Sequence, residues 1–223
     1  MEYFVFSICI PVNLLFKILC SFLLLVCFSA LFSYYFWYRP KFLPPVKSIV
    51  TVNKKDFNQL KTKASVLKDL TVNKKYNGEI CFLIDMQIAS GKNRFFIYDI
   101  KNDSVLQAGL VAHGSCDDGF QRVPTFSDKP NSGCTSTGKY RIGKPYYGIF
   151  GLAYKLYGLD STNKHAFDRN IVLHAYDCVP EQETYPVPVC NSRGCPMVSP
   201  GFLNRLKLII DQSKKPILLW IFK

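Results

Sequence analysis

Few histidines, few acidic residues and no C-x-x-C pair limit what this chain can do. Any histidine-dependent site must use His113, His165 or His174, because the sequence has only 3 histidines. The cysteine spacings fit no common zinc pattern, so no metal or other cofactor is expected. No RNP-type, zinc-finger or helix-turn-helix pattern is present, which argues against nucleic acid as the partner.

Acidic residues are also scarce relative to basic ones. The chain has 28 Lys and Arg against 16 Asp and Glu, a formal net charge of +12. This excess favours an anionic partner, such as nucleic acid, anionic lipid or an acidic cell-wall polymer, and charge alone does not choose among them. With 223 residues, 48% of them hydrophobic, the length of the chain indicates one domain or a domain with an appendage.

The N-terminus carries a long apolar run. Residues 18–38 contain no charge and end in aromatic residues just before Arg39, a pattern typical of a segment that crosses a bilayer. Residues 1–38 are therefore interpreted as one targeting segment, either a cleaved signal peptide or an uncleaved signal anchor. The absence of a good cleavage site and the aromatic run favour the anchor.

Two predictions about topology conflict. Basic residues gather after the apolar run, and by the positive-inside rule they would keep the rest of the chain in the cytoplasm. Long domains are translocated largely regardless of such charges, and the chemistry described below indicates the opposite side. Prolines at 40, 44 and 45 predict an extended spacer over residues 39–50, so that the folded domain would cover residues 51–223.

The remaining sequence predicts a mostly β fold with a few helices, arranged as a mixed sheet or partly open barrel. Apolar residues at helical spacing predict an amphipathic helix over residues 54–70, and Ser199 followed by Pro200 predicts the start of a second helix near 200–212. Short β-branched and aromatic runs predict the strands, near residues 80–88, 94–100, 105–114, 138–143, 148–159, 170–176 and 216–222.

Cys195 is the cysteine best placed to react. It follows Gly194 in "SRGCP", beside the positive charge of Arg193 and ahead of a predicted helix N-terminus, and His174 ends an apolar strand upstream. A nucleophilic cysteine needs such a cation or base, and backbone N–H groups for the oxyanion. Buried cysteines and hydrogen-bonded histidines are nevertheless commoner than catalytic ones, so the residues alone leave catalysis open.

The stretch "NIVLHAYDCVPEQETYPVPVCNSRGCPMVSP" resembles the active-site region of the murein L,D-transpeptidase catalytic (YkuD-like) family. The family pairs a strand-borne His with a later S-x-G-C element, and "VAHGSCDDGF" and "TSTGKYRIG" resemble two further family segments. The resemblance covers residues 79–222 and implies a mixed β-sheet or β-sandwich catalytic domain. Many members have His between the Ser and the Gly, where this chain has Arg193.

The resemblance also implies acyl transfer on the stem peptides of peptidoglycan. Cys195 would attack the L,D peptide bond, His174 would be its base, and the carbonyl of Ala175 would orient the imidazole. Backbone N–H groups of Gly194 and Cys195 would form the oxyanion hole. The candidates to bind or line the substrate site are Arg193, Ser192, His113 and Tyr176. For His113 the alternative, which the sequence favours, is a structural histidine at a strand end, and His165 is expected to be a solvated surface residue.

The same resemblance places the domain in the bacterial periplasm, held at the inner membrane, or secreted if the signal is cleaved. Cysteines tend to pair in that compartment, which predicts disulfides Cys116–Cys134 and Cys178–Cys190, with Cys81 a buried free thiol. An all-reduced protein is the alternative. A hydrolase that trims the stem peptide and a catalytically silent wall-binding protein are the alternative functions, and the acceptor and the oligomeric state stay open.

Overall fold

The computed structural model describes residues 12–34, 52–72 and 75–223. The chain divides into two units, Met1–Lys47 and Ser48–Lys223. The predicted spacer at residues 39–50 lies outside the described residues, as does the part of the aromatic run at residues 35–38.

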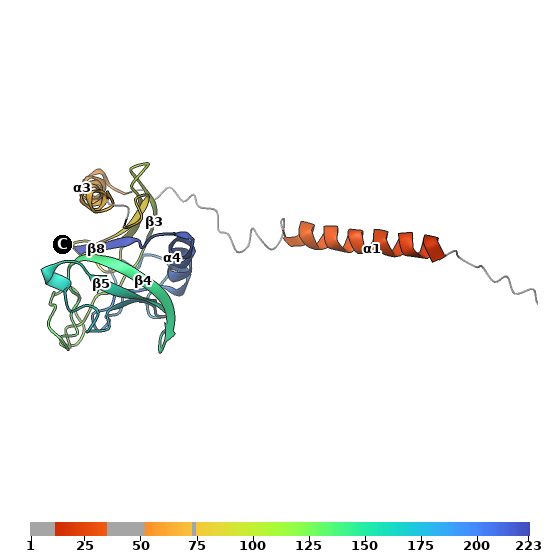
Figure 1. Ribbon diagram of the computed structural model, residues 1–223. Helices are drawn as coiled ribbons and strands as arrows, with labels where there is room; N and C mark the ends of the chain where they lie inside the picture. The colour runs from red at the N-terminus through yellow and green to blue at the C-terminus, as the bar shows by residue number, and fades with distance from the viewer. Residues whose placement is uncertain (1–11, 35–51, 73–74) are drawn as a thin grey trace, which may run out of the picture. The chain divides into compact units, whose positions relative to one another are not determined.

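The described part of the first unit is a single apolar helix, α1 (Val12–Ser33) (Figure 1). Its segment Phe16–Ser33 has a mean hydropathy of 2.2, and none of that segment is buried. At 1.5 Å per residue, 22 helical residues extend about 33 Å, enough to cross the hydrocarbon core of a bilayer. Because a signal sequence has the same length and composition, α1 fits both interpretations of the N-terminus.

The second unit is built on a mixed sheet, as the sequence predicts. The strand order is β3-β2-β1-β8-β4-β5-β6-β7, in which β1–β8 and β6–β7 pair in parallel and the other neighbours are antiparallel. The strands are β1 (Ile80–Asp85), β2 (Phe95–Asp99), β3 (Ser104–Gly109), β4 (Gly138–Gly148), β5 (Gly151–Gly158), β6 (Val172–Ala175), β7 (Met197–Val198) and β8 (Leu218–Phe222).

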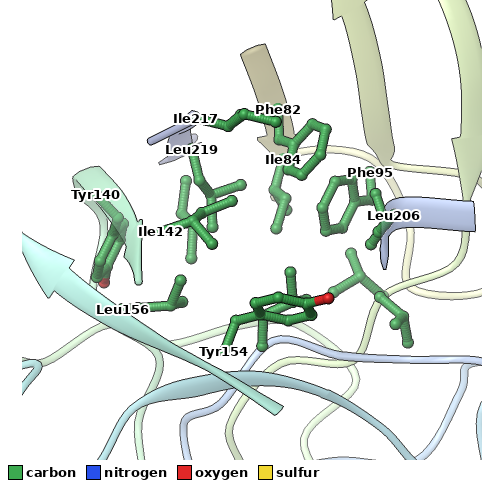
Figure 2. Packing of buried hydrophobic residues seen from close by; sticks show 14 of the residues in the cluster. Phe82, Ile84, Phe95, Tyr140, Ile142, Tyr154, Leu156, Leu206, Ile217 and Leu219 are labelled. Atoms are coloured by element: carbon green, nitrogen blue, oxygen red, sulfur yellow. The ribbon is translucent and has the colours of Figure 1, made fainter. Parts of the chain in front are cut away.

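Strand β1 is buried on both faces because helices cover both sides of the sheet. Cys81 and Leu83 pack in the cluster that contains the buried face of α3 (Lys54–Leu70). Phe82 and Ile84 pack in the larger cluster with side chains of α4 (Pro200–Gln212). Figure 2 shows this larger cluster, in which residues from β1, β2, β4, β5, β8 and α4 meet.

Both predicted helices are present and capped by side chains. The side chain of Asn53 accepts a hydrogen bond from the N–H of Asp56 at the start of α3, and Leu60, Ala64 and Leu67 are buried. Ser199 caps α4 with Pro200 in the first turn, as predicted. A short 3-10 helix, η2 (Ser161–Asn163), follows β5.

The strand prediction was wrong in two places that matter for the site. Strand β3 ends at Gly109, and the chain beyond it forms isolated bridges, Ala112 with Met197 and Gly114 with Ser192. The predicted strand over residues 138–143 continues to Gly148 and forms a long hairpin with β5. The first difference arises because this segment pairs with the chain around Cys195, a contact remote in sequence.

Candidate active site

Cys195 lies in a tight turn, residues 192–196, which leads into β7. Gly194 has a φ of +106°, and a Cβ at this position would lie 2.6 Å from the carbonyl oxygen of Cys134, so only glycine fits. Inside the turn, the Ser192 hydroxyl accepts from the Gly194 N–H at 3.1 Å and donates to the Cys195 carbonyl at 2.6 Å. We call residues 192–196 the Cys195 turn.

The thiol of Cys195 faces the strand that carries His174. Its Sγ accepts from the Val172 N–H at 3.5 Å and lies 3.9 Å from the Asn170 carbonyl oxygen. The register of β6 and β7 pairs His174 with Met197, two residues beyond Cys195. The Cys195 turn therefore lies beside β6, with the thiol at the start of the strand and His174 two residues further along.

Burial raises the pKa of the Cys195 thiol above its ordinary value, whereas the Val172 N–H and the charges of Arg169 and Lys155 lower it. The Tyr146 phenol is also close: burial, and secondly the charge of Cys195, raise the pKa of Tyr146. None of these three side chains was a candidate in the sequence, because only the folded sheet brings β4, β5 and the segment before β6 to the thiol.

His174 is 1% exposed and has a fixed orientation. Its Nδ1 donates to the carbonyl oxygen of Ala175 at 3.0 Å, the contact predicted for this residue. In the part of the chain that the structure describes, Nε2 has no hydrogen-bond partner, so the neutral ring keeps a free lone pair there. Burial lowers the pKa of His174, and the bond to Ala175 partly offsets this effect.

An aromatic side chain covers the imidazole. Phe150, at the tip of the β4–β5 hairpin, stacks on His174 with ring centroids 4.5 Å apart, and it forms a T-shaped pair with Tyr176 with ring centroids 6.1 Å apart. Tyr176 is half-exposed, whereas Ile149 beside Phe150 is 93% exposed. The hairpin tip thus presents an apolar surface next to the site.

His113 is fully buried, as the structural role favoured for it in the sequence requires. Its Nδ1 accepts from Nη2 of Arg94 at 2.9 Å, and its Nε2 lies 3.1 Å from the carbonyl oxygen of Gln121. Burial, together with the charge of Arg94, lowers the pKa of His113 to about 4. In this position His113 orders the segment that pairs with the Cys195 turn, since its carbonyl accepts from the Ser192 N–H at 2.8 Å.

Arg193 does not serve as the cation of the thiol. Its side chain is 83% exposed, its Nη2 lies 3.3 Å from Oδ1 of Asp117, and it is not among the charges that lower the pKa of Cys195. Ser192 is buried within the turn. The Ser192 hydroxyl therefore makes its hydrogen bonds within the turn, and the Arg193 side chain lies at the surface.

The N-terminus of α4 is also occupied by other groups rather than by the thiol. The Phe202 N–H donates to the Ser199 hydroxyl, and the Gly201 N–H donates to Glu181 Oε1 at 2.7 Å. These two N–H groups therefore make no hydrogen bond to Cys195.

Both predicted disulfides are present. Cys116 pairs with Cys134 and Cys178 pairs with Cys190, while Cys81 is a buried free thiol, as predicted. One bridge lies beneath the Cys195 turn, and the other ends just before it. Among residues 12–34, 52–72 and 75–223, no group of three or more His, Cys, Asp or Glu side chains is arranged to hold a metal ion.

Comparison with known proteins gives one family. The sequence matches the L,D-transpeptidase catalytic domain over residues 51–222. No curated protein matches the chain.

Several solved structures are similar at low identity. A variant of the Enterococcus faecium L,D-transpeptidase is 13% identical with a TM-score of 0.39, and the match covers 65% of this chain and 50% of that one. The helical cell shape determining protein Pgp2 from Campylobacter jejuni is 12% identical with a TM-score of 0.38, over 73% and 56% of the two chains. The match to the Xylanimonas cellulosilytica L,D-transpeptidase is 12% identical with a TM-score of 0.35, over 69% and 68%. The chain spans about half the length of the first two structures.

Proposed function

Because the chain belongs to the L,D-transpeptidase catalytic domain family, we propose that it is a peptidoglycan L,D-transpeptidase with Cys195 as nucleophile and His174 as base. The observation that carries this proposal is the fixed imidazole. The Ala175 carbonyl holds the proton on Nδ1, which leaves the Nε2 lone pair available to a thiol on the adjoining turn.

The first half of the reaction forms a thioester. Nε2 of His174 takes the proton of Cys195, and Sγ bonds to the carbonyl carbon of the L,D peptide bond in a stem tetrapeptide. The tetrahedral intermediate then expels the terminal D-residue as its amine, which receives the proton from the imidazolium. In the second half, an acceptor amine loses its proton to His174 and displaces Sγ, and the thiol is restored.

The oxyanion donor is better assigned to Cys195 than to Gly194. The Gly194 N–H already donates to the Ser192 hydroxyl, whereas no hydrogen bond within the described residues uses the Cys195 N–H. A free N–H on the nucleophile itself is well placed for the developing oxyanion. Gly194 contributes through its φ of +106°, which turns the backbone so that this N–H is not buried in a strand.

The apolar hairpin tip supports acyl transfer over hydrolysis as the leading reaction. Phe150 covers the imidazole and, with Tyr176, lines the approach to it, which limits the access of water to the thioester. Helix α1 is proposed to anchor the chain in the inner membrane with residues 51–223 in the periplasm, where stem peptides occur.

The proposed reaction is tested by incubating the purified full chain in detergent with disaccharide tetrapeptide and following the products by mass spectrometry. Transpeptidation predicts cross-linked dimers that have lost one terminal D-residue. Cys195→Ala should form none, whereas Cys81→Ala, which alters the buried free thiol of β1, should form them at a rate close to that of the wild type.

The alternative functions give different products. Disaccharide tripeptide without dimers would identify a hydrolase that uses the same nucleophile. Unchanged tetrapeptide bound to the protein would identify a wall-binding protein and would refute the proposed catalysis.

A further inference from the structure

A buried arginine joins two loops beneath the site. The side chain of Arg169 is 3% exposed, and its guanidinium binds one loop, residues 127–136, at four points. Nη1 donates to the Ser127 carbonyl at 2.9 Å and to the Ser136 hydroxyl at 3.3 Å. Nη2 donates to the Cys134 carbonyl at 2.6 Å and to the Ser132 hydroxyl at 3.2 Å. One side chain therefore fixes the whole loop.

This loop is the floor on which the Cys195 turn rests. A Cβ on Gly194 would lie 2.6 Å from the Cys134 carbonyl oxygen and 3.3 Å from Nη2 of Arg169, so the turn touches both. The Thr135 hydroxyl donates to the Gly194 carbonyl at 3.2 Å. Any loosening of the loop would move the turn that carries the thiol.

The charge of Arg169 is only partly offset. Its nearest ion-pair partner is Asp128, whose Oδ1 lies 3.6 Å from Nη1, and the other oxygen, Oδ2, binds Nδ1 of His165 at 2.9 Å. Arg169 also directly precedes Asn170, whose carbonyl oxygen lies 3.9 Å from Cys195 Sγ. The guanidinium therefore belongs to the residue next to one that contacts the thiol, and its charge lowers the pKa of Cys195.

We propose that Arg169 is the positioning residue of the nucleophile: its guanidinium holds the 127–136 loop as the floor of the Cys195 turn and supplies positive charge to the thiolate. The inference rests on the proposed function in taking Cys195 as the nucleophile. The other titratable groups around the thiol are His174 on β6, Lys155 on β5 and Tyr146 on β4. Arg193, in the turn itself, pairs with Asp117 instead.

The geometry distinguishes arginine from lysine at this position. Two nitrogens of the planar Arg169 guanidinium donate to four acceptors. The single ammonium of a lysine cannot reach all four in this geometry, although it keeps the positive charge. Arg169→Lys therefore keeps the charge near the thiol but loses the hydrogen bonds that hold the 127–136 loop. Arg169→Gln removes both the charge and these hydrogen bonds.

The test uses the full chain in detergent and measures alkylation of Cys195 by iodoacetamide from pH 6 to 11. Trypsin cleaves after Arg193 and Arg205, so the peptide 194–205 reports Cys195 without any other cysteine. We expect Arg169→Gln to move the midpoint of the profile about one pH unit higher and to slow alkylation at pH 7 about tenfold. Arg169→Lys should restore the midpoint but not the rate of cross-linking.

Arg193→Gln is the matched control, because it removes an arginine from the turn without touching the loop, and its alkylation midpoint should equal that of the wild type. In this variant trypsin releases residues 170–205 instead, and Cys178 and Cys190 are held in their disulfide, so the alkyl group still reports Cys195. The inference is wrong if Arg169→Gln and wild type share one midpoint, or if Arg193→Gln shifts it as much. Should Arg169→Gln fail to fold, a wild-type cross-linking rate in Arg169→Lys would also refute it. Because alkylation needs no wall substrate, a failure of the proposed function would remove the cross-linking comparison but leave the alkylation midpoints of Arg169→Gln, Arg169→Lys and Arg193→Gln intact.

Discussion

At the scale of single residues, burial shifts the pKa values of the proposed nucleophile and of its proposed base. Burial raises the pKa of Cys195 and lowers the pKa of His174, so both effects favour a neutral thiol beside a neutral imidazole. We therefore do not expect a thiolate of Cys195 paired with a protonated His174 in the absence of substrate, because such a pair needs a strongly lowered thiol pKa. The proton should move only when the substrate is in place.

This neutral pair predicts the pH dependence of Cys195 itself. Alkylation of the wild-type thiol should keep increasing above pH 8.5, the range of an ordinary cysteine, because burial holds its pKa higher. The measurement is the rate of modification of peptide 194–205 as a function of pH. A plateau reached by pH 7 would instead indicate a preformed thiolate and contradict the neutral pair.

A second residue-scale prediction concerns His113. Its pKa is about 4 in the folded protein against an ordinary value of 6.5, so the unfolded chain binds more protons between these values. Above pH 6.5 the neutral His113 makes its full contribution to the free energy of unfolding. As the pH falls toward 4 this contribution is lost, about 3 kcal/mol in total.

The measurement is the urea midpoint of the full chain in detergent at pH 7 and pH 5. His113→Gln, which does not titrate, should show a smaller loss between the two pH values than the wild type. An equal loss in both proteins would mean that His113 is not buried as a neutral group.

The sequence identifies candidate site residues that stand in a recognisable local pattern. It does not identify residues that only the fold brings close to Cys195. Cys195, His174 and both cystine pairs stand in short segments with recognisable neighbours. Arg169 and Lys155 lie in segments without any motif, and only strand pairing brings them to the thiol. Arg193 was chosen as the cation because it is adjacent in sequence, yet its side chain extends into solvent.

At the scale of secondary-structure elements, the β4–β5 hairpin covers the proposed catalytic base. Its tip carries Phe150 over His174, while Ile149 beside it is exposed. Phe150→Ala should let water reach the imidazole and reduce cross-linking about tenfold, with more tripeptide formed by hydrolysis.

Ile149→Ala is the comparison at the same tip and should leave the ratio of dimer to tripeptide unchanged. The measurement is that ratio in the muropeptide assay. An unchanged ratio in Phe150→Ala would mean that the stacked ring does not exclude water.

The two disulfides act on different elements and can be separated. Each closes a short loop, with separations of 18 and 12 residues, so removal of either should destabilise the domain by about 3 kcal/mol. Only the Cys116–Cys134 bridge lies in the loop that Arg169 holds under the Cys195 turn. Its removal by alanine at both positions should also slow cross-linking, whereas removal of Cys178–Cys190 should mainly lower the urea midpoint.

Measurement of urea midpoints and cross-linking rates for both double variants checks this distinction. If the two double variants are equally stable and lose the same amount of activity, the Cys116–Cys134 bridge does not specifically support the Cys195 turn.

The elements themselves were largely predictable, but their pairing was not. Apolar periodicity and caps identified α3 and α4, and β-rich runs identified most strands. The parallel pairs β1–β8 and β6–β7 join segments far apart in sequence, and nothing in their local pattern specifies the partner. The same reason explains why residues 110–114 bridge to the Cys195 turn instead of extending β3.

At the scale of the whole molecule, an apolar helix precedes a domain of the L,D-transpeptidase catalytic family. The positive charges after the apolar run favour a cytoplasmic domain, whereas the proposed substrate requires the periplasm. Alkaline phosphatase fused after Lys223 should therefore be active, since it folds only outside the cytoplasm. Activity of a β-galactosidase fusion at the same position would reverse the topology and remove the enzyme from its substrate.

The central claim is that Cys195 carries the acyl group, and the most direct measurement is the mass of the trapped intermediate. The full chain is mixed with disaccharide tetrapeptide, quenched in acid and digested with trypsin, so that residues 194–205 are recovered separately from the other cysteines. We predict that this peptide gains the mass of a disaccharide tripeptide acyl group, and that the gain is absent in Cys195→Ala and strongly reduced in His174→Ala. An acyl group on any other cysteine, or dimer formation by Cys195→Ala, would contradict the account.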